Sequence, residues 1–266
     1  MTRCNYTLTK FGLTRRRNNM KTFMDNISLA NGKWRKQYAI TLVVLGLVVG
    51  VFVTDWSDKT NWLFYITAYC LGVPCVVSLA DRYPKMGNIL GISSNVGEII
   101  INTMFGNFGL AFAGIYYGIT HIIGLKEWTK ESNQDEDGRI KVGKMNAFWV
   151  VFTLAFTIVG LIVLIMYGDK IGFTTDGSLM GNIMYWGNII AYLLGIVSQF
   201  LMIMRIDFSW WGWFASNFFW FLLDFGSGNY WFAIRDVLYQ TNVVTAIYAW
   251  YDESGKLTKG KNKELA

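Results

Sequence analysis

The sequence predicts an all-α, polytopic membrane protein with eight transmembrane helices. Hydrophobic residues make up 53% of its 266 residues and charged residues only 16%, whereas a soluble domain carries about 25% charged residues. Apolar stretches recur along the chain, and a stretch of about 17–25 residues is long enough to cross a bilayer as a helix. These stretches lack the shorter, alternating pattern of a transmembrane β-barrel.

The eight predicted spans are joined mostly by short connections. They are Tyr38–Val53, Trp62–Ala80, Met86–Phe105, Phe108–Leu125, Ala147–Tyr167, Leu179–Met204, Ser209–Phe225 and Asn229–Tyr251. The connections at Gly106-Asn107 and Gly226-Ser227-Gly228 are so short that they make the spans on either side antiparallel.

The distribution of basic residues predicts that both termini are cytoplasmic. Of the Lys and Arg residues outside the spans, 21 fall on the side of the termini and only Lys59 and Lys170 fall on the other, and basic loops stay in the cytoplasm. Residues 1–37 and 252–266 are therefore predicted to be cytoplasmic tails. The long basic segment before the first span, with no small-residue cleavage site, is not typical of a signal peptide. The net charge of +6 suits anionic membrane lipids, and no nucleic-acid partner is expected.

The second half of the chain repeats the first after 122 residues. The identities at this offset are Ser94-Asn95 with Ser216-Asn217, Gly106-Asn107 with Gly228-Asn229, Tyr117 with Tyr239, and Trp128 with Trp250. We therefore expect two three-helix repeats, 62–128 and 179–251, made parallel by the linker helix 147–167. The helix at 38–53 lies outside this symmetry. Such repeats are typical of transporters that carry their substrate at the interface between the halves.

Polar residues follow one face of several predicted spans, as expected for helices with 100° between successive residues. The third span carries Asn88, Gly91, Asn95, Glu98 and Asn102, and the seventh carries Trp210, Trp213, Asn217 and Asp224. The sixth adds Tyr185, Asn188, Tyr192 and Gln199, and the eighth adds Tyr239 and Asn242. Polar groups are costly in hydrocarbon, so these faces should line a bundle interior or a wet cavity. The alternative is that Asn and Ser only hold the helices together.

Several other polar and aromatic residues are interpreted as structural and not as part of a binding site. Adjacent Arg235 and Asp236 should point about 100° apart, which argues against a pair on one face and favours snorkelling to the interface. The lone His121 is read as an ordinary helix residue. Trp128 and Trp250 are read as interfacial anchors. The 122-residue offset makes Val77 of the first repeat the equivalent of Gln199 in the second.

No set of residues suggests an enzyme or a cofactor. Three cysteines form neither a disulfide framework nor a zinc pattern, and no Ser-His-Asp set or metal cluster is visible. A scaffold or assembly role is the other non-transport alternative, and polar faces repeated at a fixed offset argue against it. Glu98, Asp224 and Asp236 are candidate proton or sodium sites, so ion-coupled transport stays open.

One segment resembles a known family of vitamin transporters. From Arg205 the chain reads Arg, then Trp210, Trp213 and Asn217 at fixed spacings, with Gln199 ahead of them. Tyr239, Asn242 and Trp250, and Gly124 with Trp128, extend the match over about 62–250. This pattern resembles the PnuC nicotinamide riboside transporter family. The first span and basic tail exceed the family's usual seven helices, and the second repeat lacks the Gly that matches Gly124.

The resemblance implies a SWEET-like fold in a bacterial inner membrane. It also implies uptake of nicotinamide riboside by facilitated diffusion, with a cytoplasmic riboside kinase trapping the product. We expect Trp213 and Trp210 to form an aromatic wall for the cationic ring, and Gln199 and Asn217 to bind the polar groups of the substrate. The alternative for Trp210, which lies nearer the cytoplasmic end of its span, is an interfacial anchor. The remaining expected site residues are Asn95, Tyr117, Tyr239, Asn242, Asn88 and Asp224. Thiamine is the alternative substrate, and the sequence leaves open whether the chain forms a homo-oligomer.

Overall fold

The computed structural model describes residues 35–106, 108–226, 228 and 230–264, and the first 34 residues of the predicted basic tail lie outside this range. Its helices are α2 (Arg35–Val53), α3 (Lys59–Phe64), the π-helix η1 (Tyr65–Gly72), α4 (Val73–Ala80), α5 (Met86–Met104), α6 (Phe108–Trp128), η2 (Glu131–Asn133), α7 (Ala147–Tyr167), η3 (Gly168–Ile171), α8 (Leu179–Ile203), α9 (Ser209–Gly226) and α10 (Tyr230–Glu264). Because α3, η1 and α4 run on as one rod, eight long helices traverse the bundle in the described part of the chain. The predicted all-α class is confirmed.

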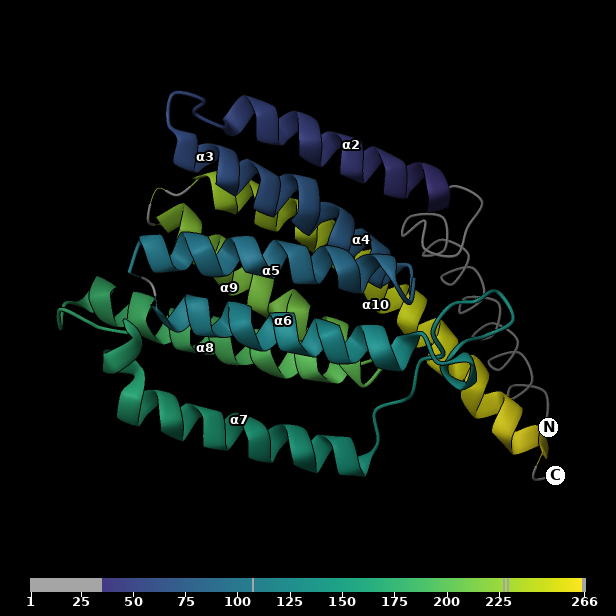
Figure 1. Cartoon of the computed structure of the whole chain (residues 1–266). Helices are drawn as coiled ribbons and strands as arrows, with labels where there is room; N and C mark the ends of the chain where they lie inside the picture. The colour runs from purple at the N-terminus through teal and green to yellow at the C-terminus, as the bar shows by residue number, and fades with distance from the viewer. Residues whose placement is uncertain (1–34, 107, 227, 229, 265–266) are drawn as a thin grey trace, which may run out of the picture.

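The helices run back and forth between two ends of the bundle (Figure 1). We call the end that carries the Arg82 and Arg205 loops the basic end, because the described Lys and Arg of the connections gather there, apart from Lys59 and Lys170. Helix α2 begins and helix α10 ends on this same side of the bundle (Figure 1). Helix α10 continues to Glu264, so most of the predicted C-terminal tail extends the last helix beyond the bundle.

Short polar side chains cap several helices where they begin. Asp58 accepts a hydrogen bond from the Thr60 amide at the start of α3. Asn146 caps α7 through the Trp149 amide, and Ser178 caps α8. Each cap satisfies an amide that the helix itself leaves without a partner.

Six helical rods form a closed ring. Contacts connect α4 to α5, α5 to α6, α6 to α8, α8 to α9, α9 to α10, and α10 back to α4. Helices α2 and α7 lie outside the ring on opposite sides (Figure 1). The third helix of each half thus contacts the first helix of the other half, an arrangement that a two-fold axis along the bundle would produce.

The first helical rod of each half ends in the same hydrogen-bonded turn. Arg82 and Arg205 adopt positive φ angles of 63° and 61°, a conformation that glycine usually supplies at this position. In both halves this Arg amide bonds three residues back and the next amide bonds five residues back: Arg82 to Leu79, Tyr83 to Ser78, Arg205 to Met202 and Ile206 to Leu201. Each residue of the first turn lies 123 residues before its equivalent in the second turn. Equivalent residues in the second and third helices of the two halves are 122 residues apart.

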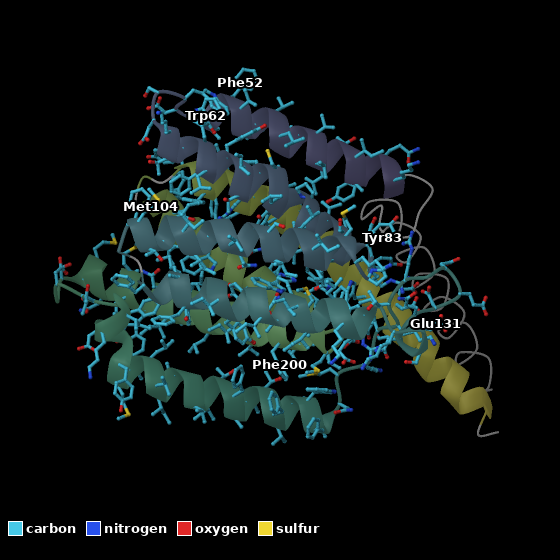
Figure 2. The ribbon with its side chains drawn as sticks, in the orientation of Figure 1. Phe52, Trp62, Tyr83, Met104, Glu131 and Phe200 are labelled. Carbon is cyan, nitrogen blue, oxygen red and sulfur yellow. The ribbon has the colours of Figure 1, made fainter. Side chains whose placement is uncertain are left out.

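The outer surface of the bundle is apolar. On α7 most large side chains are exposed, while its inner side packs against Phe200 of α8 through Trp149, Phe152 and Phe156 (Figure 2). Phe52 and Trp62 mark the exposed apolar surface near α2 and α3 in the same view. Large exposed apolar surfaces of this kind suit contact with lipid.

Five of the described helical segments are long and apolar enough to cross a membrane: 36–53, 59–80, 108–128, 147–171 and 179–203. Helices α5, α9 and α10 lie in the ring but fall outside this group. They carry the polar faces that the ring turns inward, which lowers their average hydropathy.

Candidate functional site

A cavity of about 910 Å³ occupies the interior of the ring. All six rods contribute to its lining, which reaches from Asn61 and Phe105, at the end away from the basic residues, to Trp210 and Met202. Beyond Trp210 the interior is filled by a core that includes Trp128, Trp250, Ile140 and Val142. The cavity is therefore blocked toward the basic end.

Eight of the ten expected site residues line this cavity. They are Trp213, Asn217, Gln199, Trp210, Asn95, Tyr117, Tyr239 and Asp224. Asn88 and Asn242 do not line it, because they are 0% and 1% exposed and bond to neighbouring helices. Asn242 donates to the Val76 carbonyl at 2.9 Å, and Asn88 contacts His121.

Two aromatic side chains form one wall of the cavity. Tyr117 of α6 and Trp213 of α9 face each other with ring centroids 5.9 Å apart and an interplanar angle of 51°. Trp210 lies deeper, edge-on to Trp250 at 5.6 Å, and its indole nitrogen is buried with no hydrogen-bond partner among the described residues. Trp210 thus forms the floor, and Trp213 with Tyr117 forms the wall.

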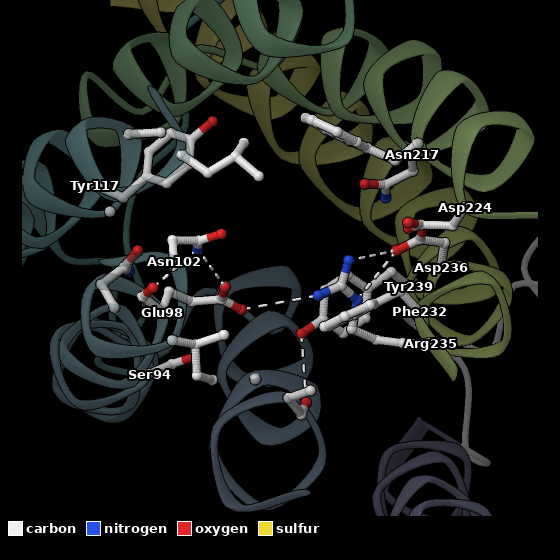
Figure 3. A pocket seen from close by; sticks show the side chains of 18 of the residues that line it. Ser94, Glu98, Asn102, Tyr117, Asn217, Asp224, Phe232, Arg235, Asp236 and Tyr239 are labelled. Carbon is white, nitrogen blue, oxygen red and sulfur yellow. Dashed lines mark hydrogen bonds and ion pairs between the residues drawn. The ribbon is translucent and has the colours of Figure 1, made fainter. Parts of the chain in front are cut away.

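A charged cluster reaches across the cavity, with Glu98 on one side and Arg235, Asp236 and Asp224 on the other (Figure 3). Arg235 pairs with Glu98 at 3.7 Å and with Asp236 at 2.9 Å, and Asp224 lies beside Asp236. The expectation that Arg235 and Asp236 cannot pair is wrong, because the long arginine side chain folds back so that its Nε and Nη2 atoms both reach the adjacent carboxylate. Arg235 is the only Lys or Arg among the described lining residues, so one guanidinium faces three carboxylates.

Asparagine side chains present oxygen atoms to the cavity. The amide nitrogens of Asn95, Asn102 and Asn188 each donate to the backbone carbonyl four residues earlier, at 2.7 to 2.9 Å. A carbonyl can only accept, so the NH₂ group must face the helix and the side-chain oxygen is left for the cavity. Together with the carboxylates, these oxygens make the lining rich in hydrogen-bond acceptors.

His121 is a lining residue that the sequence reading missed. Its ring is buried between Asn88 of α5 and Gln199 of α8, with Nδ1 3.1 Å from Asn88 Oδ1 and Nε2 3.3 Å from Gln199 Nε2. A side chain at Gly91 would collide with the ring, so that glycine makes room for it. The available signal was its position four residues after Tyr117, on the same helical face.

The third helices of the two halves make matching contacts. The Tyr117 hydroxyl lies against Gly195, and the Tyr239 hydroxyl lies against Gly72. Thr120 contacts Gln199, and Asn242 contacts Val76. Tyr117 and Tyr239, like Thr120 and Asn242, are 122 residues apart, whereas their partners are 123 apart. Gln199 therefore corresponds to Val76, and the expected match with Val77 is wrong by one residue.

Comparisons with known proteins agree with this architecture. A family model described as nicotinamide mononucleotide transporter matches residues 61–252. A solved structure described as the crystal structure of the vitamin B3 transporter PnuC is similar in fold, with a TM-score of 0.65 and 20% sequence identity, over 85% of this chain and 93% of that chain. No curated protein sequence matches the chain. The resemblance seen in the sequence is confirmed.

Proposed function

The chain belongs to the nicotinamide mononucleotide transporter family, and from this premise we propose that it carries nicotinamide riboside. One observation carries the choice of substrate. The cavity combines an aromatic wall, Trp213 with Tyr117, and a lining that is rich in acceptors and carboxylates. A ligand that suits it is flat, cationic and rich in hydrogen-bond donors.

Nicotinamide riboside has these properties. Its pyridinium ring is flat and permanently positive, and such a cation is attracted to a Trp face by roughly 0.5–2 kcal/mol. Its ribose hydroxyls and carboxamide NH₂ are donors for the oxygens of Asn95, Asn102 and Asn188. Asn217, which points into the cavity (Figure 3), can donate and accept.

The lining favours the riboside over its 5′-phosphate. A phosphate is normally bound by several Arg, Lys or helix N-terminal amides. The single guanidinium here, Arg235, is already paired with Glu98 and Asp236. A phosphate would also meet the oxygens of the lining and the Asp224 carboxylate, so the mononucleotide is disfavoured by charge.

The transport cycle follows from the blocked basic end. In the conformation described, substrate reaches the cavity from the end opposite Arg82 and Arg205, and the Trp128–Trp250 core must part for release. We place this membrane in a bacterial cell, as its inner membrane, with the basic end in the cytoplasm. Uptake is passive, and a cytoplasmic riboside kinase retains the substrate as its phosphate.

Binding to purified protein in detergent tests the substrate and the site together. Titration calorimetry should detect nicotinamide riboside binding to the wild type, and Trp213→Ala and Asn217→Ala should each weaken it at least tenfold. Trp211→Ala is the matched control, because Trp211 lies on the same helix but is 49% exposed on the outer surface. Unchanged affinity in both site variants would contradict the site, and preferential binding of thiamine would contradict the substrate.

A further inference from the structure

His121 lies between Asn88 and Gln199 in a series of hydrogen bonds that ends at the cavity: Asn88 contacts His121, and His121 contacts Gln199. Neither Asn88 nor His121 needs to touch the substrate to affect Gln199. The inference drawn from this series rests on the proposed function, with the riboside as substrate, and concerns how its carboxamide is recognised.

The hydrogen bond that Asn88 makes at one end of the series Asn88–His121–Gln199 determines which atom donates in each of the other bonds. Asn88 donates its amide nitrogen to the Pro84 carbonyl at 3.2 Å, so its oxygen is the atom that meets His121. An oxygen of this kind only accepts, and the Nδ1 atom of His121 must therefore carry the proton. In a neutral imidazole the other nitrogen, Nε2, is then an acceptor.

The orientation of Gln199 follows from that tautomer. Its amide nitrogen donates to His121 Nε2 at 3.3 Å and to the Thr120 hydroxyl oxygen at 3.0 Å. The Thr120 hydroxyl proton is already used, because it bonds to the Tyr117 carbonyl at 2.8 Å. Both hydrogens of the Gln199 amide are thus engaged, and the side-chain oxygen is the free end.

That oxygen opens on the cavity. No described residue donates a hydrogen bond to Gln199 Oε1. Polar atoms that are both enclosed and without a partner do occur in the structure, but Gln199 Oε1 is not one of them, so this atom has accessible surface. Gln199 lines the cavity, and that surface therefore faces it. The Trp210 side chain also lines the cavity, but its indole nitrogen is enclosed and has no hydrogen-bond partner among the described residues. The deep part of the site therefore offers an acceptor, Gln199 Oε1, which suits the NH₂ group of a carboxamide.

We propose that His121, held by Asn88, is a positioning residue that makes the site select a pyridine carboxamide over the corresponding carboxylate. The carboxamide NH₂ donates to Gln199 Oε1. A nicotinate carboxylate has no hydrogen for Gln199 and places negative oxygen against the Gln199 oxygen. A buried polar group left without its partner in this way is what gives binding sites strong discrimination.

The ratio of two dissociation constants tests this proposal. Nicotinamide riboside and nicotinic acid riboside differ in the group that meets Gln199 and, through it, in net charge, and the wild type should prefer the first by roughly 10- to 100-fold, the range set by one lost hydrogen bond to a buried group. In His121→Leu the Gln199 amide keeps only its contact with Thr120 and can rotate more easily, so the preference should fall by at least about threefold, and the remaining preference reflects the charge difference. Asn88→Leu frees the other tautomer and should act in the same direction.

Two further variants separate positioning from general damage. In the double variant His121→Leu with Gln199→Leu, the preference should be no lower than in Gln199→Leu alone, because His121 acts through Gln199. Ser198→Ala removes a buried hydroxyl beside Gln199 that bonds only within α8, and it should keep the wild-type preference. An unchanged preference in His121→Leu and Asn88→Leu, or an additive loss in the double variant, would overturn the proposal. A wild type that binds neither riboside would overturn the proposed function itself.

Discussion

Trp128 and Trp250 meet inside the basic end of the bundle, with ring centroids 6.0 Å apart. Each indole nitrogen donates a hydrogen bond across to the other half: Trp128 to the Ile203 carbonyl at 3.0 Å and Trp250 to the Ala80 carbonyl at 3.3 Å. Those carbonyls belong to the last residues of α8 and α4. Both rings are 0% exposed, so their interpretation as interfacial anchors is wrong, and they fasten the two halves together.

Trp128→Phe and Trp250→Phe should destabilise the protein by similar amounts. Each change keeps an aromatic ring but leaves a buried helix-end carbonyl without its donor, which costs about 1–3 kcal/mol. Unfolding in detergent, followed by tryptophan fluorescence or circular dichroism, measures the loss. Trp211→Phe at the outer surface should change the free energy of unfolding by less than about 0.5 kcal/mol. A loss in only one of the two variants would argue against equivalent roles.

Glu98→Gln should weaken the binding of the cationic riboside more than the binding of its reduced, uncharged form. Glu98 is the carboxylate that meets Arg235 across the cavity, and removing one negative charge reduces attraction for a cation by about 1–2 kcal/mol at this range. Calorimetric affinities for both ligands give the comparison. Equal losses for the charged and the uncharged riboside would show that Glu98 acts through packing and not through charge.

Asp135→Asn should destabilise the protein at neutral pH but not in acid. Partial burial alone would raise the pKa of the Asp135 carboxyl, but the Arg139 amide and the Arg82 guanidinium, at 3.0 Å, together lower it below its usual value. A lowered pKa in the folded state gives stability that is present above the unfolded pKa of about 3.9 and is lost as the pH falls through the folded pKa.

The difference in unfolding free energy between wild type and Asp135→Asn should therefore be about 1 kcal/mol at pH 7 and should vanish at low pH. Asp137→Asn, in the same loop at an exposed position, is the control and should match the wild type throughout. A difference that persists in acid would mean that Asp135 contributes through something other than its charge.

Transport should equilibrate the riboside without concentrating it. In liposomes that hold no kinase and no membrane potential, the internal concentration should rise to the external value and stop there. Imposed proton or sodium gradients should leave this plateau unchanged, apart from the effect of any potential on a charged substrate. Accumulation above the external concentration would contradict passive transport and favour a coupling-ion site, for which Glu98, Asp224 and Asp236 are the candidates.

Much of the ring could be predicted because its signals repeat along the chain. Polar faces at helical spacing identified α5 and α9 as cavity-lining helices, and the duplicated Tyr117 and Tyr239 indicated equivalent places in the two halves. Apolar length predicted the remaining helices. These properties depend on periodicity, which a single sequence contains.

The individual contacts could not be predicted in the same way. The spacing from Tyr117 places His121 on the cavity face of its helix but does not reveal its partners, since Asn88 and Gln199 reach it from other helices. The pairing of Arg235 with Asp236 depends on the length of a flexible side chain, which helix geometry at the Cβ atoms does not capture. Trp128 and Trp250 lie at helix ends, where lipid anchors also occur, and only packing distinguishes the two roles.

The direct comparison of nicotinamide riboside with nicotinamide mononucleotide tests the central claim. Both ligands are titrated into the same purified wild-type protein, at the same salt concentration and pH. The acceptor-rich lining with a single, already paired Arg235 predicts that the riboside binds at least tenfold more tightly than its phosphate. Tighter binding of the mononucleotide would contradict the proposed function.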